Sequence, residues 1–221
     1  MIVPRVNAHT AEENELCLQS IDWVRATHSI ELKAVADRIL EGTRLPEIWP
    51  GEHYRLLAGI VKTLKPIRIV EFGTFTGLSA LAMLQCLEAH ARITTIDVLP
   101  WRSFKNSCLA ESDFGDGRLV QVIADLGEKT SFEQHKALLM DADMILIDGP
   151  KDGIFEPRLL SQLSSLHFSG APIVVLDDIR FWNMVPIWEK LTAPKIDLTS
   201  YGHWSGTGIV RWRTGAFVGG T

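Results

Sequence analysis

IVEFGTFTGLSA, residues 69–80, joins a β-branched apolar run to an apolar helix through two glycines, Gly73 and Gly77. Loops of this kind bind nucleotides, and the residues between the glycines decide which nucleotide fits. A dinucleotide loop has another glycine two residues after the first, where its backbone approaches a pyrophosphate. This chain has Phe75 there, whose bulk would crowd a pyrophosphate, and the stretch lacks the Gly-Lys-Ser/Thr of a P-loop.

The remaining interpretation is a tight turn from a strand into a helix. The backbone N–H groups of such a turn bind a smaller anion, such as a carboxylate. Ser79 adds a hydroxyl donor in the first helical turn, and Asp97 ends the next predicted strand. An acidic residue there accepts hydrogen bonds from both hydroxyls of a ribose. A ligand with a carboxylate and a ribose but no phosphate fits S-adenosylmethionine. The alternative is a purely structural turn followed by a strand that ends on an acidic residue.

The rest of the chain alternates short apolar runs with helical patterns, which is typical of β-α-β crossovers and a mostly parallel sheet covered on both faces. Predicted strands span 67–72, 92–97, 118–124, 143–148 and 171–178, and two last runs, 195–200 and 206–212, are expected to form a hairpin. Predicted helices span 12–41 with Gly42 as its cap, 52–64 ended by Pro66, 77–90, 103–111, 131–140, 156–166 and about 183–191. We therefore expect an α/β, Rossmann-like, doubly wound fold. Its mostly parallel seven-stranded sheet would carry a C-terminal antiparallel hairpin and N-terminal helices.

Composition and charge restrict the class of protein. Apolar residues make up 46% and charged residues 22%, as in soluble globular proteins, and the formal net charge of −5 at pH 7 does not favour nucleic acid or anionic membranes. The first residues contain no apolar signal sequence, and the richest apolar window is too short to span a bilayer. Three widely spaced cysteines indicate reduced thiols in a cytoplasmic protein, and the seven histidines show no metal-ligand spacing.

Four of the five predicted parallel strands finish on a carboxylate or one residue short of one. These residues are Glu71, Asp97, Asp148 and the pair Asp177 and Asp178. In an open α/β sheet, ligands bind at the carboxyl ends of the strands, near the point where the strand order reverses. A single acidic residue there is as readily explained as a helix cap, but four strand ends of one sheet favour a binding site.

The last of these strands predict a metal site. If the strands that end at Asp148 and Asp177 are neighbours, three carboxylates converge and repel one another. A hard divalent cation, above all Mg²⁺, would relieve the repulsion. Lys151 would reach the same place. The alternative is that Asp177 and Asp178 cap the next helix while Lys151 pairs with Asp152.

The segment VEFGTFTGLSA resembles the first motif of the class I S-adenosylmethionine-dependent methyltransferases, and its Gly-x-aromatic-x-Gly-x-Ser form is similar to the catechol and caffeoyl-CoA O-methyltransferase branch. The resemblance covers about residues 52–212. It implies that Glu71 helps to hold the amino group of the methionine moiety. The backbone at Gly73 and Phe75, together with Ser79, would hold the amino-acid end, and Asp97 would hold the ribose.

The resemblance extends to the later strands. Asp125, in ADLGE (124–128), follows the third strand, where this family contacts the adenine edge, although it serves equally well as a helix cap. Metal-dependent members have an Asp after the fourth strand, an acidic pair or Asp-Asn after the fifth, and a base three residues beyond the first Asp. Asp148 and Lys151 match the catechol type. Asp178 stands where that type has Asn and matches related natural-product and sugar enzymes instead, so the acceptor stays open.

We therefore expect a single methyltransferase domain over 1–221, with a helical cap over 1–50 and the catalytic core over 51–212. The expected reaction is metal-assisted methylation of a small-molecule hydroxyl, with Lys151 as the base once burial and the metal lower its pKa. Two alternatives remain, a metal-free methyltransferase whose Asp148 and Asp177 shape the pocket, and a non-catalytic S-adenosylmethionine-binding module.

Aromatic residues near glycine or proline are candidates for substrate walls or lids, or for ordinary packing; they are Trp49, His53, Tyr54, His203 and Trp204. Trp101 follows Asp97 closely and would stack beside the adenosine or close the edge of the sheet. The helices predicted over 12–41 would cap the substrate side or form the surface of a homodimer.

Overall fold

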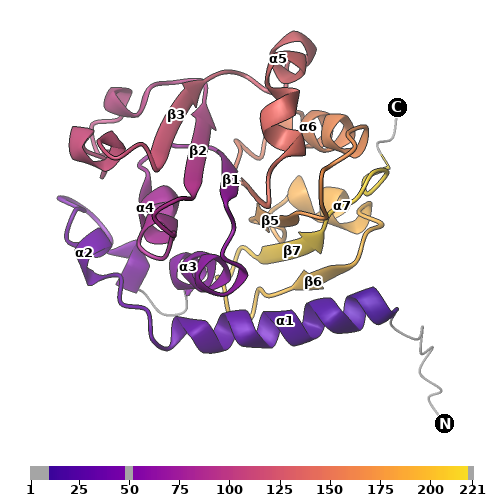
Figure 1. Cartoon of the computed structure of the whole chain (residues 1–221), viewed down its shortest axis with the longest axis horizontal. Coiled ribbons are helices and arrows are strands. Elements are labelled where there is room, and N and C mark those ends of the chain that lie inside the picture. The colour runs from indigo at the N-terminus through magenta and orange to yellow at the C-terminus, as the bar shows by residue number, and fades with distance from the viewer. Residues whose placement is uncertain (1–9, 48–51, 219–221) are drawn as a thin grey trace.

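The computed structural model describes residues 10–47 and 52–218, so Trp49 lies outside the described residues. Within them, seven strands form one sheet in the order β3-β2-β1-β4-β5-β7-β6 (Figure 1). The strands are β1 (Arg68–Phe72), β2 (Arg92–Asp97), β3 (Leu119–Ile123), β4 (Met144–Ile147), β5 (Ile173–Asp177), β6 (Lys195–Asp197) and β7 (Thr207–Arg211). β7 runs antiparallel to β5 and β6, whereas the pairs among β1 to β5 are parallel. The predicted doubly wound, seven-stranded fold with a C-terminal antiparallel hairpin is confirmed.

The strand order reverses at β1, which pairs with β2 on one side and with β4 on the other. Glu71 lies beside Thr95 of β2 and Leu146 of β4. This reversal is the point at which open α/β sheets bind their ligands. The loop after β1, which carries the quoted motif, therefore begins at the expected place for a ligand.

Helices cover both faces of the sheet (Figure 1). They are α1 (Ala11–Thr27), α2 (Lys33–Ala36), α3 (His53–Leu64), α4 (Leu78–Leu84), α5 (Lys129–Met140), α6 (Phe155–Ser164) and α7 (Met184–Glu189). Short 3-10 turns occur at η1 (Leu45–Glu47), η2 (Trp101–Ser103) and η3 (Glu111–Phe114). Within the described residues, no helix is both long enough and apolar enough to cross a lipid bilayer.

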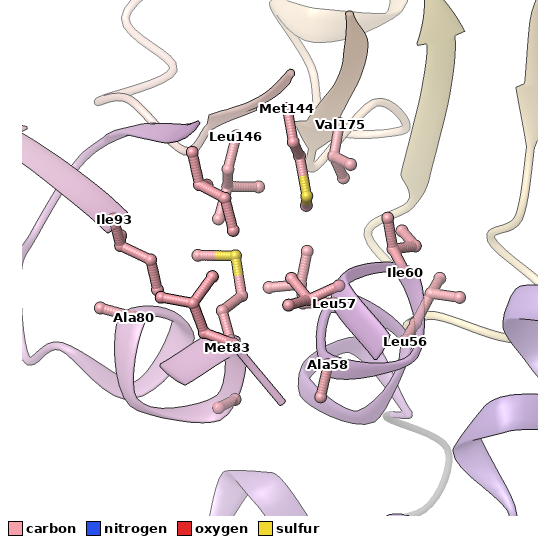
Figure 2. Packing of buried hydrophobic residues seen from close by; sticks show 14 of the residues in the cluster. Leu56, Leu57, Ala58, Ile60, Ala80, Met83, Ile93, Met144, Leu146 and Val175 are labelled. Atoms are coloured by element: carbon pink, nitrogen blue, oxygen red, sulfur yellow. The ribbon is translucent and has the colours of Figure 1, made fainter. Parts of the chain in front are cut away.

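Alternating strand residues pack against different helices. On one face, Met144 and Leu146 meet α3 and α4, as Figure 2 shows. On the other face, Ile145 and Ile147 join the cluster that includes residues of α5, α6 and α7. Because side chains alternate along a strand, β4 is apolar throughout and is buried on both faces.

The prediction of one helical segment over 12–41 is wrong. α1 ends at Thr27, where the Thr27 hydroxyl donates to the Val24 carbonyl oxygen at 2.6 Å and the Ser29 hydroxyl to that of Ala26 at 2.9 Å. Such bonds compete with the helical backbone ladder. Only the four residues of α2 are helical after this break, and Gly42 lies in a bend beyond α2 instead of capping it.

The helix predicted over 103–111 is also wrong, because that region is held by side chains and not by a helical ladder. Its ends lie in the turns η2 and η3. The buried Asp113 carboxylate accepts from Arg38 Nη1 and Nη2 at 2.6 and 2.9 Å, and also from the backbone of Ala110 at 2.7 Å. This ion pair ties the segment to the chain that follows α2.

α1 packs along α3 and also contacts β6 (Figure 1). Leu16 and Trp23 bury their side chains in the core on this side of the sheet. A β-carbon on Gly59 would lie 2.7 Å from the carbonyl oxygen of Trp23, so the close approach of the two helices requires glycine. The inner face of α1 is therefore part of the core, while Leu18 and Ile21 are exposed on its outer face.

Candidate active site at the strand ends

The loop after β1 is a left-handed turn that needs its glycines. Gly73 has φ +96°, and Gly77, just before α4, has φ +82°. A β-carbon on Gly77 would lie 2.3 Å from Cγ of Leu109, so a larger residue would collide as well as strain the backbone. Phe75 also has a positive φ, of 41°. Its side chain is 57% exposed and its ring packs edge-on against Phe104 at 5.2 Å.

Asp97 holds this loop in place from the end of β2. Its Oδ2 accepts from the backbone N–H groups of Thr74 and Phe75 at 2.9 and 3.1 Å. Its Oδ1 accepts from the N–H of Leu99 at 3.1 Å. The predicted ribose acceptor therefore already orients the loop expected to hold the other end of the ligand.

Glu71 is fully buried beneath the turn. The Ser79 hydroxyl donates to Glu71 Oε1, while Glu71 Oε2 has no hydrogen-bond partner among the described residues. Burial raises the pKa of Glu71 to about 7. An unpaired buried carboxylate oxygen is costly, and an ammonium group would satisfy it. Ser79, predicted to contact the ligand directly, donates its hydroxyl hydrogen to Glu71.

The carboxylates after β4 and β5 do converge. Oxygens of Asp148, Asp177 and Asp178 lie within 4.8 Å of one another. Lys151 pairs with Asp148, and its Nζ lies 3.0 Å from Asp178 Oδ2 and 3.8 Å from Asp177 Oδ2. We call these four residues the carboxylate-lysine cluster. Burial, together with the charge of Asp177, raises the pKa of Asp148 to about 7.

The structure does not show the lowered pKa that a lysine base requires. Burial alone lowers the pKa of Lys151, but the charges of Asp148, Asp177 and Asp178 outweigh it, so the net shift is upward. Without a bound cation, Lys151 is therefore an ammonium group that partly neutralises the three carboxylates. We therefore expect a lowered pKa for Lys151 only when a bound cation neutralises the three carboxylates in its place.

The backbone beside Lys151 is fixed from two sides. Glu156 Oε1 accepts from the Lys151 N–H at 2.8 Å, and the Asn183 side chain donates to the Lys151 carbonyl at 3.1 Å. The alternative pairing with Asp152 is not found, since Asp152 accepts from the backbone of Ile154 and Phe155. These contacts explain how Lys151 keeps a positive φ of 53°.

The alternative role of Asp177 and Asp178 as helix caps is likewise not found. The residue at the N-cap of α7 is Asn183, and no side chain caps that helix. Asp178 has a left-handed backbone with φ 60°. Both carboxylates are therefore available to the cluster.

Two histidines approach Oδ1 of Asp177, whereas Lys151 lies nearer to Oδ2. His203 Nε2 lies 2.6 Å and His53 Nδ1 lies 3.6 Å from Asp177 Oδ1. Burial lowers the pKa of His53; for His203 burial also acts downward, but the hydrogen bond to Asp177 raises its pKa overall. The sequence placed both among candidate substrate walls and gave neither a role beside a carboxylate. No spacing signal links them, because one begins α3 and the other precedes β7.

A cavity of about 640 Å³ opens beside the loop after β1. It is lined by Arg38, Ile39, Leu40, Glu41, Thr43, Leu45, Tyr54, Phe75, Thr76, Leu78, Lys105, Asn106, Ser107 and Cys108. A larger hollow of about 770 Å³ lies among residues of α5, α6 and α7, and none of the predicted site residues lines it. The smaller cavity is therefore the better candidate for a substrate, because it adjoins the motif.

Solved structures of methyltransferases share this architecture over nearly the whole chain. The SAH-bound methyltransferase PaMTH1 of Podospora anserina is 18% identical, with a TM-score of 0.53 over 96% of this chain and 99% of that one. The O-methyltransferase TomG of Streptomyces achromogenes, involved in tomaymycin synthesis and solved with SAM, is 20% identical, with a TM-score of 0.51 over 86% and 93%. A methyltransferase of Geobacter sulfurreducens is 12% identical, with a TM-score of 0.53 over 91% and 96%.

The chain has the fold of the class I S-adenosylmethionine-dependent methyltransferases. This confirms, at the level of the fold, the resemblance inferred from the first motif. No protein-family model matches the chain, and no curated protein matches it. The similarity to methyltransferases is therefore found by comparing structures and not by comparing sequences.

Within this methyltransferase fold, Asp125 stands apart from the other predicted residues. Its side chain is exposed and its Oδ1 accepts from the N–H of Gly127 at 2.9 Å, which is a local turn contact. Trp101 stacks on Phe114 at 5.7 Å and packs against the core. Tyr54 lines the smaller cavity, and Trp204 is 74% exposed.

Proposed function

We propose that this chain is an S-adenosylmethionine-dependent O-methyltransferase that acts on a hydroxyl group of a small molecule with the help of a divalent cation, for which we propose Mg²⁺. The observation that carries the proposal is the unpaired oxygen of buried Glu71, which lies beneath a glycine turn at the reversal point of the sheet. The fold supports it, as do two solved relatives described with SAH or SAM bound.

The residues around the first loop fit the cofactor. Glu71 Oε2 would accept a hydrogen bond from the ammonium group of the methionine moiety, with Ser79 holding the other oxygen. The backbone from Gly73 to Gly77 would face the amino-acid end, and Asp97 has remaining lone pairs for the ribose. Asp125, whose carboxylate accepts from Gly127 in a local turn, is the residue we propose for the adenine edge.

The donor set at the end of β4 and β5 fits a hard cation. Asp148, Asp177 and Asp178 would hold it, since carboxylate oxygens are the ligands that Mg²⁺ prefers. A divalent cation supplies Lewis acidity that lowers the pKa of a substrate hydroxyl. Once these carboxylates serve as ligands, they raise the pKa of Lys151 less, and its amine can accept the hydroxyl proton at Nζ.

The remaining task of the chain is to position the two reactants. The turn after β1 and the carboxylate-lysine cluster meet where Gly73 touches the backbone of Asp148, so the methyl donor and the acceptor would lie close together. Correct orientation of two reactants contributes up to roughly 7–11 kcal/mol to catalysis. The acceptor oxygen would then attack the sulfonium methyl in line.

One observation favours a metal-free methyltransferase as the second candidate. Lys151 already lies among the three carboxylates and makes an ion pair with Asp148. In that case, Lys151 and the aspartates would orient the acceptor without a cation. Inhibition by EDTA that Mg²⁺ reverses supports the metal-assisted enzyme, whereas full activity in EDTA supports the second candidate.

Calorimetry with S-adenosylhomocysteine and with NAD tests the cofactor assignment directly. We expect binding of the first and none of the second. Binding of NAD alone would overturn the proposal. Transfer of a labelled methyl group to a panel of catechols, sugars and other vicinal diols then separates an enzyme from a non-catalytic binding module.

Three further expectations stay proposals. A homodimer would use the exposed Leu18 and Ile21 on α1. A small molecule, and neither nucleic acid nor a membrane, is the proposed partner, in agreement with the net charge of −5. A cytoplasmic location is supported by the cysteines, since Cys17, Cys86 and Cys108 are free thiols.

A further inference from the structure

The two carboxylate oxygens of Asp177 face different groups. Oδ2 faces the Lys151 ammonium at 3.8 Å, on the side of the carboxylate-lysine cluster. Oδ1 faces two imidazoles, with His203 Nε2 at 2.6 Å and His53 Nδ1 at 3.6 Å. One residue at the end of β5 therefore belongs to two different sets of potential ligands.

The second set consists of two nitrogens and one oxygen that converge. His53 Nδ1, His203 Nε2 and a carboxylate oxygen of Asp177 all lie within 4.8 Å of one another. The side chains are 7%, 17% and 11% exposed, in that order. They come from the start of α3, the loop before β7 and the end of β5, so the packed sheet fixes their relative positions.

A neighbouring hydroxyl group supports a ligand role for His203. The Ser205 hydroxyl lies 2.5 Å from His203 Nδ1 and can accept a hydrogen bond from it, so Nε2, which is hydrogen-bonded to Asp177, is the nitrogen that would bind an ion after losing its proton. Histidines that bind metals usually donate their other ring N–H in this way. The buried Thr207 hydroxyl, 3.2 Å from His53 Nδ1, adds one more oxygen at the same place.

We propose that His53, His203 and Asp177 bind a divalent transition-metal ion such as Co²⁺ or Zn²⁺, at a site that shares only Asp177 with the carboxylate set that would take Mg²⁺. Imidazole nitrogens favour these borderline ions, whereas all-oxygen sites favour Mg²⁺. Two histidines and one carboxylate leave coordination positions open for water or a ligand. The proposal goes beyond methyl transfer and does not depend on it.

Titration of the full-length apo-protein with Co²⁺ in the presence of excess Mg²⁺ tests the proposal, since nitrogen ligands give Co²⁺ distinct visible absorption bands. We expect a stoichiometry of one and bands that persist at high Mg²⁺. His203→Gln should weaken Co²⁺ binding ~10-fold or more, and Ser205→Ala should weaken it by a smaller factor. The matched control is His135→Gln on α5, whose imidazole is hydrogen-bonded to the Ser131 carbonyl of its own helix.

Circular dichroism of each variant first establishes that it is folded. Equal Co²⁺ affinity in the wild type and in His203→Gln would overturn the proposal, as would bands that Mg²⁺ abolishes or a complete absence of binding. The titration contains neither methyl donor nor acceptor. Its failure therefore leaves the methyltransferase proposal standing, and failure of S-adenosylhomocysteine to bind leaves the metal site standing.

Discussion

The backbone at Gly73 touches the backbone at Asp148. A β-carbon on Gly73 would lie 2.1 Å from the carbonyl oxygen of Asp148, which is far closer than any real contact. This single approach joins the loop after β1 to the start of the carboxylate-lysine cluster. The proposed cofactor site and the proposed metal site therefore depend on one another through a position that only glycine can occupy.

Gly73→Ala should disturb both sites at once. We expect a loss of stability of roughly 2–5 kcal/mol from strain and overlap, together with weaker S-adenosylhomocysteine binding. Gly42→Ala is the matched control, because Gly42 has a similar φ of +92° but nothing within 4 Å of its added β-carbon. Urea denaturation and calorimetry measure the two effects. Equal losses in the two variants would show that backbone strain, and not the contact with Asp148, dominates.

Glu71→Gln should change the pH dependence of stability. Burial raises the pKa of Glu71 from 4.5 to about 7, so the ligand-free protein holds this proton more tightly than the unfolded chain does. The resulting stability is present below pH 4.5 and is lost as the pH rises to 7. Glutamine stays neutral, so the variant should be more stable than the wild type at pH 8, by at most about 3 kcal/mol, with no such advantage at low pH.

The same variant should bind the cofactor less well. An amide cannot replace the charge-assisted hydrogen bond to an ammonium group, and we expect S-adenosylhomocysteine affinity to fall by about 10–100-fold. Calorimetry at pH 8 provides the measurement. Unchanged affinity would remove Glu71 from the proposed cofactor site, while the stability effect would remain as evidence of its burial.

Lys151→Ala should abolish methyl transfer while leaving cofactor binding nearly intact. General bases contribute about 10²–10⁴-fold to turnover, and Lys151 contacts the aspartates but not the loop that would hold the cofactor. Lys136→Ala on α5 is a suitable control, since Lys136 is half-exposed and pairs with Glu133 on the same helix. Steady-state kinetics with calorimetry separates the two roles. Retained turnover would exclude Lys151 as the base.

Removal of individual carboxylates should reveal whether the cluster holds Mg²⁺. Asp178→Asn keeps an oxygen ligand, so we expect activity that needs more Mg²⁺. Asp148→Ala removes a ligand and should lose Mg²⁺-dependent activity altogether. Activity measured against Mg²⁺ concentration distinguishes these outcomes. A metal-free enzyme would instead show the same activity with and without EDTA in every active variant.

α1 should contribute to stability through one face only. Trp23 is 2% exposed and packs in the core beside α3, whereas Leu18 is 66% exposed on the same helix. Trp23→Ala should cost about 3–5 kcal/mol, and Leu18→Ala less than about 0.5 kcal/mol. Chemical denaturation measures both. A large effect of Leu18→Ala would indicate that this face is covered in solution, as a homodimer would require.

Local patterns in the sequence were sufficient for the strands of the sheet but not for every helix. Apolar runs marked the strands, and residues such as Glu71 and Asp97 marked the ends at which a ligand would bind, because strand periodicity and strand-end chemistry are local properties. Local patterns did not reveal the break after Thr27, where side-chain hydroxyls donate hydrogen bonds to backbone carbonyls. They also gave no sign that Ser79 would turn toward Glu71.

The seven strands, the glycine turn and the acidic strand ends follow from local patterns in the sequence. The packing of the folded chain sets which distant groups meet. It brought His53 and His203 to the same oxygen of Asp177, and it surrounded Lys151 with three carboxylates that raise its pKa. The physical reason is that hydrophobic periodicity acts between near neighbours in the chain, whereas the charge around a buried group depends on every element packed against it.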